Sequence, residues 1–185
     1  IITANEGDDR DGDGDLNDAA RVGDLTDDFG VSAANQAYWE SELGERLKLS
    51  AIDGVGSNGD IEVAHAFGGR SFSIYDDNGN LVFDSGNQLD EIAKEAGIYD
   101  DGRSDDKGME PEMVLTQAIN DSVYAFVAME RADRSAIAMY DVTEPANSRF
   151  VQLFTNSTDN PNAISGAEAW GPEGLLFIET QNKDR

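Results

Sequence analysis

Short runs in which apolar and polar residues alternate make up most of the chain, and this is the pattern of β-strands with one buried face. Asn78-Gly79 lies between two such runs and predicts a tight hairpin. Short strands separated by Gly, Asn and Asp predict an all-β protein. The strands are expected at 1–6, 61–67, 71–76, 81–84, from 113 onward, 123–129, 136–142, 150–154 and 175–179.

Two segments have helical periodicity instead. Residues 31–46 form one, and the second follows Asn87, the expected N-cap, with Leu89, Ile92 and Ala93 on one face and Gly97 as its end. We interpret both as excursions from the sheets. The predicted organisation is a single domain over residues 1–185, with insertions near 8–60 and 87–108.

Acidic residues recur at strand ends. A Pro-Glu pair that ends in Glu112 precedes one apolar run, and a second pair that ends in Glu173 precedes another. In addition, one expected strand ends in Glu6 and another ends in Glu130. Repeated units of about 40–50 residues suit propeller blades. The sequence therefore predicts about three to four blades of a β-propeller, in which Glu6, Glu112, Glu130 and Glu173 converge.

The charge is strongly acidic. The 185 residues include 13 basic and 38 acidic ones, a net charge of −25, and such a field repels nucleic acid and anionic membranes but attracts cations. There is no cysteine and no apolar run long enough for a membrane span. Because the chain opens on Ile1 inside an expected strand, we expect a fragment of a longer protein, whose remaining blades would be its partners.

One loop has the spacing of calcium ligands, at Asp9, Asp11, Asp13 and Asp15, with Gly14 at the sixth position. The twelfth position is Ala20, so the loop is either an incomplete calcium site or a solvated acidic loop. His65 is the single histidine and is expected to pack on a strand face. Any metal should therefore have oxygen ligands, which favours calcium, with magnesium as the alternative.

Several ordered segments resemble the choice-of-anchor I family: 4–8, 67–74, 81–86, 103–108, 124–127, 140–145 and 171–175. The family consists of secreted or surface-anchored bacterial proteins, and some relatives carry alkaline-phosphatase-like labels. The resemblance implies a propeller of the seven-bladed type, export from the cell, and anchoring by a segment outside this chain. Met109 and Met113 depart from the family pattern, where Pro and Gly are expected.

The Glu110-Pro111-Glu112 segment is similar to that of calcium-dependent propeller phosphatases and phytases. On this analogy the four glutamates hold calcium, which activates a water molecule, while Arg70, Arg103 and Lys107 bind phosphate. The alternative is a structural role, in which each Glu caps a turn or binds backbone amides and each Arg pairs with a neighbouring Asp. The predicted function is then a metal-dependent phosphoester hydrolase acting on a phosphorylated small molecule, with its catalytic residues unassigned. The alternatives are a non-catalytic surface or adhesion module that carries structural calcium and contacts a surface polymer, and a lactonase-like propeller hydrolase.

Overall fold

The structure is a computed structural model that describes residues 1–7, 18–25, 42–57, 61–132, 135–155 and 171–178. Its contacts divide the chain into two compact units. The first contains Ile1–Glu6, Arg70–Asp100 and Met109–Arg185, and the second contains Gly7–Gly69 and Asp101–Gly108. Each unit is described by itself below.

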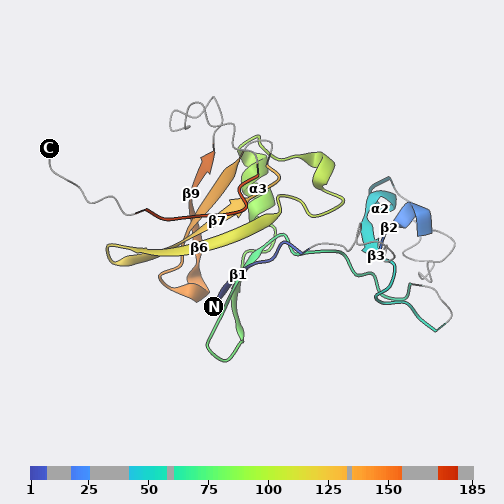
Figure 1. Cartoon of the computed structure of the whole chain (residues 1–185), viewed down its shortest axis with the longest axis horizontal. Coiled ribbons are helices and arrows are strands. Elements are labelled where there is room, and N and C mark those ends of the chain that lie inside the picture. Colours follow the sequence, from blue (N-terminus) through green and yellow to red (C-terminus); the bar gives the residue numbers. More distant parts are fainter. Residues whose placement is uncertain (8–17, 26–41, 58–60, 133–134, 156–170, 179–185) are drawn as a thin grey trace. The chain divides into compact units, whose positions relative to one another are not determined.

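The regular secondary structure of the described residues is mostly β, in three antiparallel sheets (Figure 1). The first unit holds the three-stranded sheet β1-β4-β5 and the four-stranded sheet β6-β7-β8-β9, and the second unit holds the pair β2-β3. The strands are β1 (Ile2–Ala4), β2 (Ala19–Arg21), β3 (Lys48–Ser50), β4 (Phe72–Tyr75), β5 (Leu81–Asp84), β6 (Pro111–Ile119), β7 (Ser122–Met129), β8 (Ala136–Asp141) and β9 (Arg149–Thr155). The helices are α2 (Glu42–Arg46) and α3 (Gln88–Glu95), with short 3-10 turns η1 (Val22–Leu25), η2 (Asp101–Arg103) and η3 (Pro145–Asn147).

The Asn-Gly hairpin is confirmed between β4 and β5. Its turn is held by Asp76, whose Oδ1 accepts hydrogen bonds from the backbone N–H groups of Asn78 at 2.9 Å and Asn80 at 2.8 Å. The side-chain amide of Asn80 donates to Asp76 Oδ2 at 2.9 Å. Turn chemistry thus accounts for this cluster of polar side chains.

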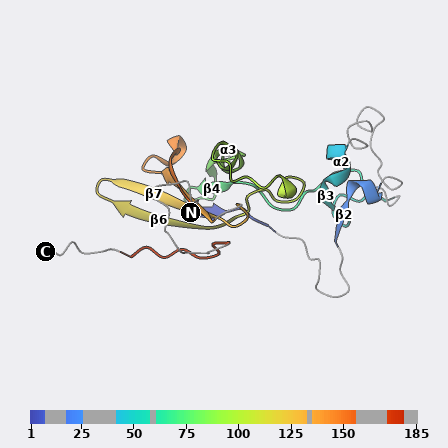
Figure 2. The same ribbon diagram turned by 90° about the horizontal axis from the view of Figure 1, so that it is seen from above.

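Side chains from the two sheets and from α3 form the core of the first unit. Figure 2 shows α3 next to β4. Along β8, Ala136, Ala138 and Tyr140 are buried at every second position, as expected for a strand with one core face. The Tyr140 ring packs edge-on against Phe72, with ring centroids 4.8 Å apart. Burial raises the pKa of the Tyr140 hydroxyl, which donates to Gln88 Oε1 at 3.3 Å.

Helix α3 follows the predicted face, since Leu89 and Ala93 are fully buried. It ends before Gly97, whose φ of 69° is the left-handed conformation common after a helix. Asn87 is the N-cap residue of α3, as predicted, but its side chain makes no cap hydrogen bond. The Asn87 amide instead donates to Glu91 Oε1 at 2.8 Å.

In the second unit the predicted strand over 61–67 is wrong. Within it Ile61 and Ala66 make isolated bridges, to Val55 and Leu49, but no continuous ladder forms. His65 is exposed and does not pack on a strand face, which corrects the expectation for it. Of the helix predicted at 31–46, the part within the described residues is α2.

The last predicted strand is also corrected. Residues 171–178 have no regular secondary structure, and Glu179 lies outside the described residues. This segment is nevertheless packed, because the Phe177 ring lies 6.4 Å from that of Phe126 and the Leu175 N–H lies 3.1 Å from Met113 Sδ. In the described part of the chain, no helix has both the length and the apolar character needed to cross a membrane.

Candidate functional site

Three of the four glutamates that the sequence predicts to converge do lie together in the first unit. Glu6 follows β1, Glu112 lies in β6 and Glu130 follows β7. One carboxylate oxygen of each residue lies within 4.8 Å of a carboxylate oxygen of each of the other two, and all three residues are half-buried. We call Glu6, Glu112 and Glu130 the glutamate cluster.

A β-bulge places Glu112 in this cluster. In the β6–β7 ladder Pro111 pairs with Met129, and Met113 pairs with Ala128, so Glu112 is the extra residue on β6. A bulge bends its strand and re-aims the side chain of the extra residue. The backbone is already unusual just before it, because Glu110 has a φ of 49°, which is rare for a residue other than glycine. The pairing continues past the bulge, with the Glu130 N–H donating to the Glu110 carbonyl at 3.0 Å.

A polar network fixes the chain next to Glu6. The Asn5 backbone N–H donates to the Ser71 carbonyl at 3.0 Å, and the Asn5 amide lies 3.0 Å from Ser71 Oγ and 2.6 Å from Ser73 Oγ. Both serine hydroxyls in turn donate to Asp84 Oδ2. Because these hydrogen bonds join β1, β4 and β5, the end of β1 and therefore Glu6 are held on the sheet.

Two further residues of the site were missed by the sequence analysis, namely Glu110 and Arg131. The Glu110 side chain is 0% exposed, and its Oε2 lies 3.5 Å from Arg131 Nε. The same guanidinium lies 3.1 Å from Glu130 Oε1 through its Nη2 and is 50% exposed. Arg131 therefore bridges a buried carboxylate and a member of the glutamate cluster. A lone Arg after a strand gives no sequence signal for this role.

We expect Arg131→Gln to lower the free energy of unfolding by about 1–3 kcal/mol, because loss of a cation beside a buried carboxylate leaves that charge less compensated. Urea denaturation at neutral pH with a chelator present measures this. Arg149→Gln is the matched control, since the Arg149 side chain is 74% exposed and pairs with Asp141. The control should change stability by no more than about 0.5 kcal/mol, and an equal loss in both variants would contradict the prediction.

The donor set of the glutamate cluster fits calcium. All three groups offer oxygen, which hard divalent cations prefer, and none offers nitrogen or sulfur. Calcium–oxygen distances are about 2.3–2.6 Å, so two ligands on opposite sides of one ion are at most about 5 Å apart. The spacing within the cluster is compatible with this limit. Magnesium, at about 2.1 Å, sets a tighter limit of about 4.2 Å between two opposite ligands.

The other predicted metal ligands are placed differently. Glu173 is exposed and does not belong to the glutamate cluster. Its neighbour Gly171 does lie against the cluster, since a Cβ added there would come within 3.2 Å of Glu130 Cγ. The loop ligands Asp9, Asp11, Asp13 and Asp15 lie outside the described residues.

The predicted phosphate-binding cations have partners in the protein. Arg70 forms an ion pair with Asp90 at 2.9 Å. Burial acts to lower the pKa of Arg70, but the hydrogen bond and charge of Asp90 outweigh it and raise that pKa. Arg103 lies 3.6 Å from Asp106, and Lys107 is buried. Arg70 belongs to the first unit and the other two to the second, so the phosphate-binding role of the three stays a prediction.

Comparison with known proteins gives one match. The family profile of the choice-of-anchor I domain matches residues 1–145. No curated protein and no solved structure matches the chain significantly.

Proposed function

The chain belongs to the choice-of-anchor I family, and from this premise we propose that it is a calcium-binding module of a bacterial cell-surface or secreted protein. Membership of the family supports the surface-associated setting. The calcium ligands in this proposal are Glu6, Glu112 and Glu130.

The single observation that carries the proposal is the convergence of three carboxylates from three different strand ends. Like charges this close repel one another, and a divalent cation between them removes that cost. The local structure holds the arrangement in place through the bulge at Glu112 and the polar network beside Glu6. The net charge of −25 further favours cations near the surface.

A propeller remains our proposal for the architecture of the parent protein. The four-stranded sheet β6-β7-β8-β9 is an antiparallel meander in chain order, which is the form of a propeller blade. β6 is the first strand of this sheet, and it lies beside β1 of the three-stranded sheet (Figure 1). In such an architecture the glutamate cluster would lie where two neighbouring blades meet.

Isothermal titration of the metal-free chain with calcium, and separately with magnesium, tests the binding proposal. We expect saturable calcium binding that is tighter than magnesium binding, together with a higher melting temperature in calcium than in chelator. An unchanged melting temperature and no binding heat for either ion would contradict the proposal.

A second candidate function is calcium-dependent hydrolysis of phosphoesters. The observation in its favour is that the three glutamates are half-buried and not sealed from solvent. Calcium takes 6–8 oxygen ligands, so three carboxylates would leave positions for water and substrate. Bound calcium would lower the pKa of a coordinated water molecule and supply a nucleophile.

Hydrolysis of p-nitrophenyl phosphate, with calcium and then with chelator, separates the two functions. Activity that chelator abolishes would support the hydrolase. Calcium binding without any turnover would leave the cation as a structural ion of a surface module.

A further inference from the structure

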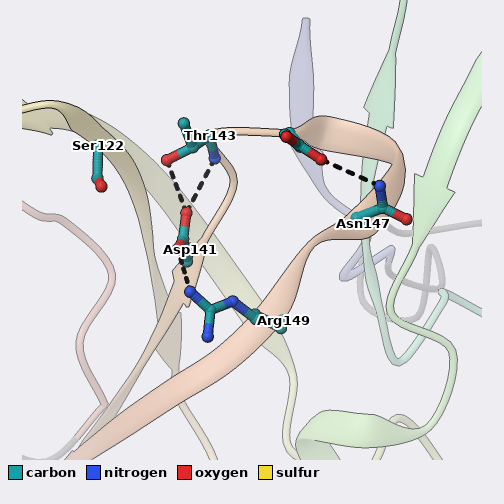
Figure 3. A pocket seen from close by; sticks show the side chains of 6 residues that line it. Ser122, Asp141, Thr143, Asn147 and Arg149 are labelled. Atoms are coloured by element: carbon teal, nitrogen blue, oxygen red, sulfur yellow. Dashed lines mark hydrogen bonds and ion pairs between the residues drawn. The ribbon is translucent and has the colours of Figure 1, made fainter.

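A polar cavity lies at the opposite end of the four-stranded sheet from the glutamate cluster. The cluster is at the Pro111–Met129 end of the β6–β7 ladder, and the cavity is at the Ile119–Ser122 end. Its volume is about 420 Å³, within the range of small-molecule sites. The cavity is lined by Ser122, Asp141, Thr143, Glu144, Asn147 and Arg149 (Figure 3).

Hydrogen bonds within the cavity wall hold its side chains in place (Figure 3). Asp141 Oδ1 accepts from the Thr143 N–H at 3.1 Å and from the Thr143 hydroxyl at 2.7 Å, while Asp141 Oδ2 accepts from Arg149 Nη2 at 2.7 Å. On the η3 side Asn147 Nδ2 donates to Glu144 Oε2 at 3.2 Å. The wall is therefore formed before a ligand arrives, which lowers the entropic cost of binding.

These hydrogen bonds also favour the ionised form of the Asp141 carboxyl in the cavity wall. The hydrogen bonds from Thr143, and then the contact with Arg149, lower the pKa of the Asp141 carboxyl. Two carboxylates and one guanidinium line the cavity, which gives a net charge of −1. Within a chain of net charge −25, such a wall repels anions.

Both donors and acceptors on this wall keep capacity for a ligand. Among the described residues, three groups make no hydrogen bond: the Ser122 hydroxyl, Glu144 Oε1 and the side-chain amide oxygen of Asn147. The Nε and Nη1 atoms of Arg149 are also available as donors, because its bond to Asp141 uses Nη2. Donors and acceptors therefore both line one small space. Hydroxyl groups suit such a wall because each one both donates and accepts.

We propose that this cavity binds a small neutral polyhydroxylated ligand of the size of one or two sugar units. The Glu144 carboxylate and the Asn147 amide accept hydrogen bonds from ligand hydroxyls, and the free edge of Arg149 donates to ligand oxygens. The site does not depend on the glutamate cluster, since it shares no residue with it. Affinity is expected to be weak, in roughly the millimolar range, because the wall is open and strongly solvated.

Chemical-shift mapping of the ¹⁵N-labelled full chain tests the proposal, with D-glucose, D-galactose and N-acetyl-D-glucosamine as probes. We expect saturable shifts confined to the backbone around residues 122 and 141–149 with at least one sugar. Glu144→Gln and Asn147→Ala should each weaken that binding about tenfold, the effect of losing one good hydrogen bond. Glu95→Gln, which makes the same charge change on the exposed end of α3, should leave it unchanged.

Inorganic phosphate and methylammonium serve as comparison probes. The absence of shifts with all three sugars, or shifts that the cavity variants do not alter, would overturn the proposal. A stronger response to methylammonium or phosphate than to every sugar would also overturn it, because the cavity would then select charge and not hydroxyl groups.

Discussion

Replacing Phe72 with alanine is expected to lower the free energy of unfolding by about 3–5 kcal/mol, the usual cost of removing a fully buried aromatic ring. Phe72 is 0% exposed. Its ring lies 5.5 Å from that of Phe83 and 4.8 Å from that of Tyr140, measured between centroids. Since β4 carries Phe72 and β8 carries Tyr140, the substitution opens a cavity where the two sheets of the first unit share a core.

Urea denaturation, monitored by the far-ultraviolet circular dichroism of the backbone, measures this loss. Phe154→Ala provides the control, because Phe154 on β9 is 39% exposed. It should cost about 1 kcal/mol or less, in line with the smaller area it buries. Equal losses in the two variants would show that the ring of Phe72 does not stabilise a common core.

Glu112→Gln is expected to weaken calcium binding at the glutamate cluster by at least about 100-fold. Changes to the outer partners of metal ligands already cost about 10–100-fold, and this one removes the charge of a ligand itself. In chelator, by contrast, the variant should be at least as stable as the original chain, because one of three crowded negative charges is gone. Calorimetric titration and melting curves in both conditions measure the two effects.

The opposite signs in calcium and in chelator distinguish a metal ligand from a residue that merely supports the fold. A supporting residue would lower stability in both conditions. Glu95→Gln is the matched control, since it removes the same charge from the exposed end of α3 and should leave calcium affinity within about twofold of the original. If Glu112→Gln and this control bind calcium equally well, the ion does not use the glutamate cluster.

Local patterns predicted the parts of the fold that local chemistry determines. The Asn78-Gly79 turn specifies its own hairpin, and the alternating apolar residues of β7 and β8 match a sheet with one core face. The alternation over 61–67 was equally regular, yet no strand formed there. A strand needs a neighbouring backbone along its whole length, and a sequence window does not contain that information.

The sequence pattern predicted one part of the glutamate cluster, namely which residues come together. Acids at strand ends identified Glu6, Glu112 and Glu130, because the ends of neighbouring strands meet at one edge of a sheet. Nothing local indicated that Glu112 would lie in a bulge, or that Glu110 would adopt a positive φ and lie buried against Arg131. These features depend on the pairing of β6 with β7, which is a long-range property.

Strand β9 connects the fold to the behaviour of the protein in solution. Within the described residues it has a neighbouring strand on one side only, and it exposes Phe150, Val151 and Phe154. An open apolar edge of this kind is a template for sheet-to-sheet association between molecules. The net charge of −25 opposes such association at neutral pH. Acidification that protonates the carboxylates removes this colloidal protection, so the acidity of the chain keeps its own strand edge from seeding aggregates.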